Sequence, residues 1–296
     1  MLEKNTSTSR KVFQVLNALF FVLFTFLCVY PLWYVLIQSL SSGNTGKAVF
    51  LPEGFTLKNY TQVFQMPNVA HAMGVSVLRT VIGTVATVGA CMLLGYLFTK
   101  EEMPGRKVLY RLLVVTMYVS GGLIPTYLVY KSYGLLNNFW VYILPGAVSA
   151  YYVILIKTFV EQLPKAVEES AMIDGANTLT IFARIILPVS LPIVATIAVY
   201  AAVRQWNSWF DNHVYALTNK NILTLQYMLY KYLNEAERIA KELQEMSTDM
   251  ANVDNLLTPR GVRMTVTMVT VIPVLFIYPF LQRYFIKGIM IGAVKG

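Results

Sequence analysis

Residues 161–188 read EQLPKAVEESAMIDGANTLTIFARIILP and lie between two strongly apolar stretches of the sequence. Pro164 suits the first turn of a helix, where its missing N–H group costs no hydrogen bond. Glu168 and Glu169 follow in the N-terminal half of that helix, where the helix dipole favours negative charge. Gly175 can adopt the left-handed conformation that ends many helices. The segment therefore predicts a short helix that ends near Gly175.

A second short helix is expected directly after this bend. Asn177 or Thr178 could cap its first turn. Its apolar side chains form one stripe, made of Ile181, Phe182, Ile185 and Ile186. Ser170 and Ala171 are small, so another surface can approach the backbone of the first helix. Pro188 begins the next apolar stretch, and we therefore expect two short helices, joined at a bend, outside the apolar layer.

Six apolar stretches surround this segment, and each is long enough to cross a membrane. A spanning helix needs about 20 mostly apolar residues, and the stretches cover approximately residues 13–38, 75–98, 108–130, 139–160, 188–210 and 264–286. Pro31 is expected to kink the first of them. Of all residues, 56% are hydrophobic and only 13% are charged, whereas soluble domains contain about 25% charged residues. The sequence therefore predicts one all-α membrane domain, residues 1–296, with six transmembrane helices.

Lysine and arginine residues in the short connecting segments predict the orientation of the chain. The connecting segments and termini on one side of the membrane would contain Lys4, Arg10, Lys11, Lys100, Arg106, Lys107, Arg111, Lys157, Lys165, Arg184, Arg283, Lys287 and Lys295. The short segments of the other side contain only Lys47, Lys58 and Lys131. We therefore expect both termini and residues 161–188 in the cytoplasm. The longer segment 211–262 is expected outside, either as a solvated cap or as a docking surface for an extracellular partner.

The composition excludes several classes of function. The basic residues behind the net charge of +9 lie mostly at the ends of apolar stretches, so they anchor the chain and nucleic-acid binding is not expected. Two cysteines without a CxxC pattern and two distant histidines predict neither a metal site nor catalytic residues. The sequence lacks the GxxxxGK[ST] pattern that cradles nucleotide phosphates, so this chain is expected to bind no ATP, no Mg²⁺ and no other cofactor.

The spacing within residues 161–188 resembles the signature of permeases of binding-protein-dependent ABC importers. That signature is Glu-Ala-Ala, three residues, Gly, nine residues, Ile, one residue and Leu-Pro. Glu169, Ala171 and Gly175 match it, as do Ile185, Leu187 and Pro188, whereas Ser170 replaces the central Ala. The additional residues Asp174, Ala176 and Phe182 resemble the carbohydrate-uptake branch.

The resemblance implies a transport complex in the cytoplasmic membrane of a prokaryote, embedded in lipid. This chain would pair with a second, related permease, two cytosolic ATPase subunits would bind ATP and Mg²⁺, and an extracytoplasmic solute-binding protein would deliver a carbohydrate. In the family, the loop forms coupling helices that sit in a cleft of the ATPase. The residues implied in coupling are Glu168, Glu169, Ser170, Ala171, Asp174, Gly175, Ala176, Phe182, Ile185, Leu187 and Pro188.

The C-terminal residues also resemble a family feature. The chain ends with Gly292, Ala293, Val294, Lys295 and Gly296, and the smaller permease of maltose-type importers has a similar Gly-rich tail that reaches between the ATPase subunits. Glycines let a chain thread a narrow gap, and Lys295 could pair with acidic groups. An ordinary disordered tail is the alternative.

Residues near the end of the fifth apolar stretch are candidates for the solute pathway. They are Gln205, Trp206, Asn207, Trp209 and Asp211. Aromatic rings stack on apolar sugar faces, and amides bind hydroxyl groups. A belt of aromatic residues at the membrane surface is the alternative. Arg79 and Arg204 also lie near the ends of apolar stretches, whereas Gly83, Gly89 and Gly95 are expected to allow close helix packing.

Three other functions remain open from the residues alone. The same docking loop would serve an importer of a peptide or a phosphodiester. An integral membrane enzyme would need a cluster of His, Asp or Glu at one face, and the acidic residues of the loop come without His. An ion-driven transporter should contain acidic residues inside its spans, and none lies near the centre of an apolar stretch.

Overall fold

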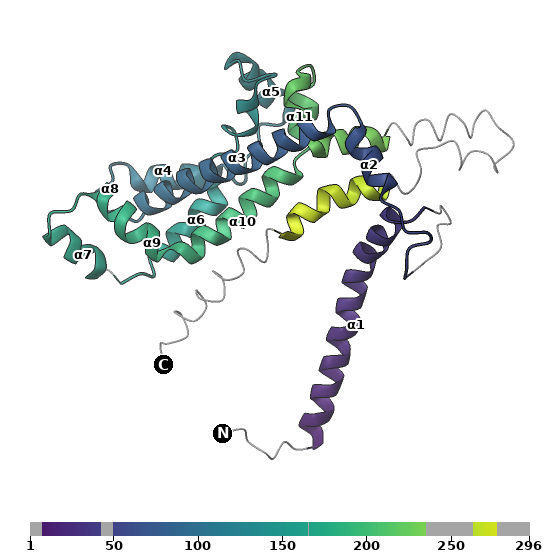
Figure 1. The fold of residues 1–296 in the computed structure, drawn as a ribbon. Helices are drawn as coiled ribbons and strands as arrows, with labels where there is room; N and C mark the ends of the chain where they lie inside the picture. The colour runs from purple at the N-terminus through teal and green to yellow at the C-terminus, as the bar shows by residue number, and fades with distance from the viewer. Residues whose placement is uncertain (1–7, 43–49, 165, 235–262, 277–296) are drawn as a thin grey trace. The chain divides into compact units, whose positions relative to one another are not determined.

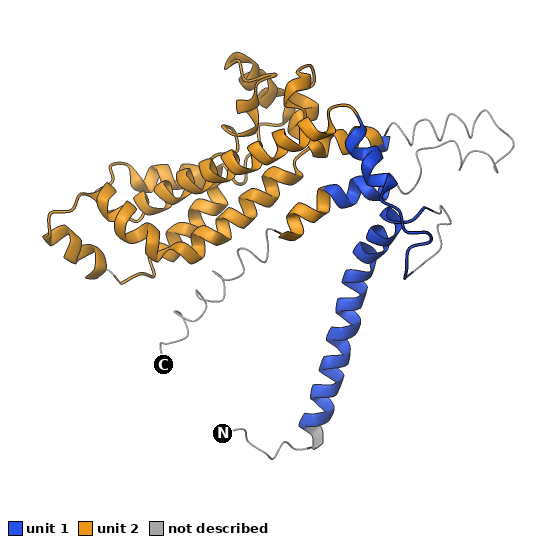
Figure 2. Ribbon diagram, viewed as in Figure 1, with its two compact units in different colours: residues 1–66, 233–269 blue, residues 67–232, 270–296 orange. Residues whose placement is uncertain are grey.

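The structure is a computed structural model that describes residues 8–42, 50–164, 166–234 and 263–276. The described residues contain no β-strand, only an isolated bridge between Ser41 and Phe55, so the predicted all-α class is confirmed. The chain divides into two compact units, residues 1–66 with 233–269 and residues 67–232 with 270–296 (Figure 2). Each unit is described by itself.

The first unit contains α1 (Thr8–Ser39) and α2 (Lys58–Gln65). Pro31 lies inside α1, and the helix continues through it to Ser39. Most apolar side chains of α1 are exposed, which suits contact with lipid or with another transmembrane helix. The Asn59 side chain donates hydrogen bonds to the carbonyl oxygens of Ser39 (3.0 Å) and Ser41 (3.1 Å). These bonds satisfy carbonyl groups at the C-terminal end of α1.

The second unit is built around three helices that pack side by side, α3 (Val69–Leu97), α6 (Ala150–Val160) and α10 (Leu191–Asn207) (Figure 1). Gly95 lets α3 approach α6 closely, because an added Cβ atom would lie 2.6 Å from Cγ2 of Ile156. At Gly83 such an atom would lie 2.5 Å from the Gln205 side chain, whereas Gly89 has no other atom within 4 Å. The expectation of close packing therefore holds for Gly83 and Gly95, whereas at Gly89 the described residues of this chain leave it a prediction.

Two of the expected spans are interrupted in the structure. The stretch 108–130 contains α4 (Arg106–Val115) and α5 (Leu123–Ser132), with a break at residues 116–122. The stretch 139–160 contains a short 3₁₀ helix, η1 (Phe139–Tyr142), before α6. By length and hydropathy, α1 and α3 can each cross a membrane, and a bent pair that ends with α10 makes a third candidate among the described residues. The six-span count therefore stays a prediction.

The remaining elements connect these helices. They are α7 (Ala166–Ile173), α8 (Thr178–Ile181), the π-helix η2 (Phe182–Ile186), α9 (Leu187–Val189), α11 (Phe210–Tyr215) and η3 (Lys220–Ile222). Helical residues 225–234 follow, and a helix covers Arg263–Phe276. The chain bends by 82° at Ser190, between α9 and α10. Pro188 was expected to begin a span, but it lies before this bend, and the straight helix begins at Leu191.

Candidate coupling segment and polar cavity

The segment 161–188 folds as two short helices around a defined turn. The first of them, α7, ends in a Schellman motif, because the N–H of Ala176 bonds to the Ala171 carbonyl and the N–H of Gly175 to the Met172 carbonyl, each at 3.0 Å. Gly175 has the left-handed φ of +79° that this motif requires. Of the two expected caps, Asn177 caps α8, accepting a hydrogen bond from the Thr180 N–H at 2.8 Å. The bend is therefore fixed by local sequence.

Several contacts attach this segment to the end of α3. Glu168 of α7 forms an ion pair with Lys100, whose ammonium group also lies 4.4 Å from the ring centroid of Tyr96. The Tyr96 ring packs against Phe182, with 5.4 Å between centroids. The buried apolar residues of the segment, Ala171, Ile181 and Ile186, belong to the same core as α3 and α6. These contacts connect α7 to the helix bundle, so a displacement of α7 would also displace the end of α3.

The opposite face of the segment is exposed and partly apolar. Met172 is 45% exposed and Ile173 is 86% exposed, beside the exposed residues Glu169 and Asp174. Ser170 is also exposed and donates a hydrogen bond to the Ala166 carbonyl at 2.8 Å, so the Ser for Ala replacement leaves no unpaired polar group. The sequence reading missed Met172 and Ile173, although their position beside Asp174 at the helix end was the available signal. A charged rim around exposed apolar side chains is typical of a protein-binding surface.

The chain bends at Ser190, just after the segment 161–188. Ile185 and Leu187 are half-buried and Pro188 is exposed. The Ser190 side chain is fully buried, and its hydroxyl has no hydrogen-bond partner among the described residues. The π-helix η2 is followed by α9 and then by this bend, and π-helical turns are frequent at functional sites.

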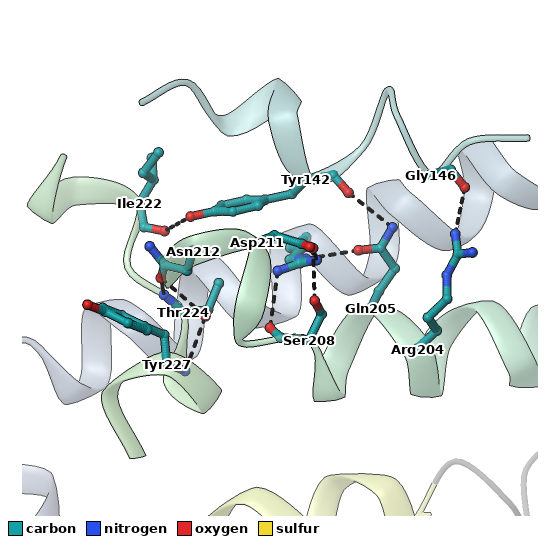
Figure 3. Close-up of polar contacts among 11 residues, drawn as sticks. Tyr142, Gly146, Arg204, Gln205, Ser208, Asp211, Asn212, Ile222, Thr224 and Tyr227 are labelled. Atoms are coloured by element: carbon teal, nitrogen blue, oxygen red, sulfur yellow. Dashed lines mark hydrogen bonds and ion pairs between the residues drawn. The ribbon is translucent and has the colours of Figure 1, made fainter. Parts of the chain in front are cut away.

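A polar network lies around Arg79 of α3, and Figure 3 labels its partners Gln205, Ser208 and Asp211. Arg79 is 2% exposed. Its guanidinium donates to Oε1 of Gln205 (2.9 Å) and to the carbonyl of Ser208 (3.2 Å), and it forms an ion pair with Asp211. It also lies 4.5 Å from the ring centroid of Tyr142. Because an unpaired buried charge is costly, these partners hold the corner between α10 and α11 against α3.

The partners of Arg79 are themselves bonded. The Ser208 hydroxyl donates to the Asp211 carboxylate at 2.8 Å, and the Gln205 amide donates to the Tyr142 carbonyl at 3.2 Å. The Tyr142 hydroxyl donates to the Ile222 carbonyl at 2.9 Å, as Figure 3 shows. The network therefore connects residues 79, 142, 205, 208, 211 and 222.

A cavity of about 270 Å³ opens beside this network. Its lining consists of Arg79, Tyr130, Val141, Tyr142, Pro145, Gly146, Arg204, Gln205, Ser208, Asp211 and Tyr215. Residues 143–149 lie outside helices, and irregular backbone at membrane depth is tolerated where it is buried in protein or lines a cavity. Burial raises the pKa of the Tyr215 phenol, and the Asp211 carboxylate adds to the rise, so this hydroxyl stays protonated and can donate.

The five residues expected to line a solute pathway do not converge. Gln205 and Asp211 line the cavity. Trp206 is buried and donates to the Thr270 carbonyl at 2.9 Å. The Trp209 ring stacks on Tyr230, with 4.1 Å between centroids, and Asn207 accepts a hydrogen bond from Gln226.

Arg79, Tyr130, Tyr142 and Tyr215 line the cavity in addition. Arg79 is the one charged residue of the stretch 75–98, and for this reason it was already a candidate functional residue together with Arg204.

The structure gives little information on two further predictions, which concern the C-terminal tail and metal binding. Residues 292–296 lie outside the described residues, and so does any contact of the C-terminal tail. Within the described parts of the chain, no group of three or more His, Cys, Asp or Glu residues could hold a metal ion.

Known proteins resemble this chain over nearly its full length. No family model matches the sequence. A "Polygalacturonan/rhamnogalacturonan transport system permease protein" of Bacillus subtilis (strain 168) is 36% identical over 289 residues, which is 97% of this chain and 99% of the relative. The protein LplC of the same strain is 37% identical, with 99% of this chain and 97% of LplC covered.

A solved structure agrees with these relatives. It is the crystal structure of a bacterial ABC transporter involved in the import of the acidic polysaccharide alginate. The matching chain has a TM-score of 0.79 and 28% identity, over 95% of this chain and 99% of that one. Together with the loop signature, these similarities show that the chain belongs to the permease subunits of binding-protein-dependent ABC importers, in the carbohydrate-uptake branch.

Proposed function

We propose that this permease imports an oligosaccharide across the cytoplasmic membrane and that residues 161–188 couple the transport to ATP hydrolysis by a partner. A permease subunit of this family works with a second permease, an ATPase and a binding protein. In our proposal the second permease is a related chain, two ATPase subunits bind ATP and Mg²⁺, and this chain binds neither. Both termini lie in the cytoplasm. The saccharide is proposed because one relative is named for polygalacturonan and rhamnogalacturonan and the solved transporter for alginate.

The observation that carries the coupling role is the two-sided construction of α7. One side joins the helix core through Ala171 and the Glu168–Lys100 ion pair. The other side exposes Met172 and Ile173. When ATP binding closes the ATPase subunits, a helix built this way would move with them as a rigid body and switch the pore between its two open states.

A bulky residue on the exposed side of α7 tests this role. Ser170→Trp should abolish most ATP-dependent uptake while the protein still inserts and co-purifies with the second permease, because the new ring fills the space that the ATPase needs. Ser132→Trp is a matched control, since Ser132 is also exposed and donates the same kind of local bond, to the Val129 carbonyl at 2.8 Å. Unchanged uptake in Ser170→Trp, measured in proteoliposomes of the complete transporter, would contradict the coupling role.

The nature of the solute is tested separately. A panel of labelled saccharides, peptides and phosphodiesters, offered to cells that lack the chromosomal gene and express this chain, should give uptake of a saccharide. Uptake of a peptide or a phosphodiester instead would contradict the saccharide and leave the coupling role intact.

For the C-terminal tail, we propose contact with the ATPase subunits. Deletion of residues 292–296 should reduce ATPase co-purification or stimulated turnover. Wild-type levels of both would contradict this contact.

A further inference from the structure

The charges that line the cavity beside Arg79 do not balance. Arg79 and Arg204 both line it, and Asp211 is the one carboxylate among the lining residues. Asp211 is bonded to Arg79 and to the Ser208 hydroxyl. Among the described residues, the cavity therefore carries one excess positive charge, and that charge belongs to Arg204.

Arg204 is held in place but not neutralised. Its guanidinium donates to the Gly146 carbonyl at 2.6 Å and lies 5.9 Å from the ring centroid of Tyr152. Among the described residues, no carboxylate forms an ion pair with it, and the side chain is exposed. A guanidinium has five N–H donors, so most of them remain free for a ligand. Ionisable residues in spans mostly face the protein interior or a water-filled cavity, and Arg204 lines this cavity.

Gly146 fixes the position of this guanidinium. A Cβ atom at residue 146 would lie 2.9 Å from the terminal nitrogen of Arg204. Because that nitrogen is the end of a flexible side chain, a larger residue at 146 would displace the guanidinium of Arg204 and leave the backbone of α10 intact. The absence of a side chain here keeps Arg204 against the carbonyl and directed at the cavity.

The other groups of the cavity suit a sugar ring. Tyr130 and Tyr215 line it, and their rings pack edge to face with 4.9 Å between centroids. Neither hydroxyl has a hydrogen-bond partner among the described residues, so both can bind ligand oxygens. Aromatic rings also offer faces for the apolar side of a sugar. The volume lies just below the range of about 300–1,000 Å³ typical of ligand pockets, which fits one sugar unit of a longer chain.

We propose that Arg204 binds the carboxylate of an acidic sugar unit, a uronate, as the saccharide passes through this cavity. The inference rests on the proposed import of a saccharide and adds the residue and the chemical group that it recognises. A guanidinium binds a carboxylate through two parallel hydrogen bonds, whereas a neutral sugar would leave the excess charge unpaired. Arg79 does not take this role, because its donors are already bonded to Gln205, Ser208 and Asp211.

The test compares an acid with its own ester in the complete transporter. Trigalacturonate and its fully methyl-esterified form have the same rings and differ in charge. In proteoliposomes with all partner subunits, Arg204→Gln should reduce uptake of trigalacturonate about tenfold, the loss expected for one charge-assisted pair, and should change uptake of the ester little. Arg204→Lys should retain part of the acid uptake, and Gly146→Ala should lower it without any change of charge.

The controls separate this role from simpler ones. Arg111→Gln removes one exposed positive charge from α4, away from the cavity lining, and should leave uptake of both probes unchanged. An equal loss of acid and ester uptake in Arg204→Gln would contradict the inference and indicate an ion pair with the second permease instead. No uptake of either saccharide by the wild-type complex would contradict the proposed function itself.

A binding measurement avoids the selectivity of the solute-binding protein. The affinity of the purified permease–ATPase complex for trigalacturonate, measured by titration calorimetry without the binding protein, should fall about tenfold in Arg204→Gln. It should not change in Arg111→Gln. Equal affinities of wild-type and Arg204→Gln complexes would overturn the inference, whatever the uptake of the ester.

Discussion

The coupling segment exposes apolar side chains, whereas the polar cavity is built around a buried charged side chain. On α7, Ile173 is 86% exposed while the small Ala171 is buried, so the helix offers apolar surface to a protein. In the cavity, Arg79 is 2% exposed and bonded to several partners. Because a charge near lipid must be paired or face water, the cavity network holds a folded corner together. The comparison indicates that substitutions in the network around Arg79 should damage stability, whereas substitutions on α7 should damage coupling.

The largest expected effect comes from removing the centre of the cavity network. Arg79→Ala leaves the Asp211 carboxylate, which is 33% exposed, without its cation and the Gln205 amide oxygen without its donor, and should destabilise the protein by about 3 kcal/mol. Thermal unfolding of the detergent-purified protein measures this. Glu161→Ala removes the exposed partner of Lys157 and should cost at most about 1 kcal/mol. Similar melting temperatures for the two variants would mean that the Arg79 network does not hold the corner.

A smaller effect on stability is expected from the packing of α3. Gly95→Ala places a Cβ atom 2.6 Å from Cγ2 of Ile156, and such overpacking costs about 1–3 kcal/mol. Gly89→Ala meets no atom of the described residues within 4 Å and should be neutral or slightly stabilising, because Ala favours helix over Gly. Both residues lie on α3, so the pair is matched in helix and in chemistry. A destabilised Gly89→Ala would show that this face of α3 is covered.

The smallest effect on stability should accompany a clear effect on coupling. Glu168→Lys breaks the ion pair with Lys100, in which the two side chains are 20% and 12% exposed, and should cost about 1–2 kcal/mol. Uptake per ATP hydrolysed should nevertheless fall severalfold, because α7 then loses a connection to α3. Adding Lys100→Glu should restore part of the coupling. If the double variant is no better than Glu168→Lys alone, the ion pair does not transmit the motion.

The two regions also differ in how far they could be predicted from sequence. The turn at Gly175 and the cap at Asn177 depend on neighbouring residues, so the local pattern predicted the turn and limited the cap to Asn177 or Thr178. The cavity combines α3, α5, η1, α10 and α11, and no local pattern specifies which side chains meet there. Gln205 and Asp211 were expected at the pathway and line the cavity.

Other details depended on tertiary packing. Trp206 follows Gln205 by about 100° around the helix and is buried on a different face, where it bonds to Thr270. The bend at Ser190 was missed because Leu187 to Asn207 reads as one apolar run. The break at residues 116–122 had a visible signal in Ser120-Gly121-Gly122, since such residues favour turns.

The central claim is that the exposed side of α7 touches the ATPase partner, and site-directed cross-linking tests it most directly. Ile173→Cys, made in a Cys28→Ser background that leaves the buried Cys91, should form a cross-link to the ATPase subunit in native membranes, and ATP should change its yield. Tyr118→Cys is the control, because Tyr118 is 84% exposed but lies at the break between α4 and α5. No cross-link at residue 173, or an equal one at residue 118, would contradict the claim.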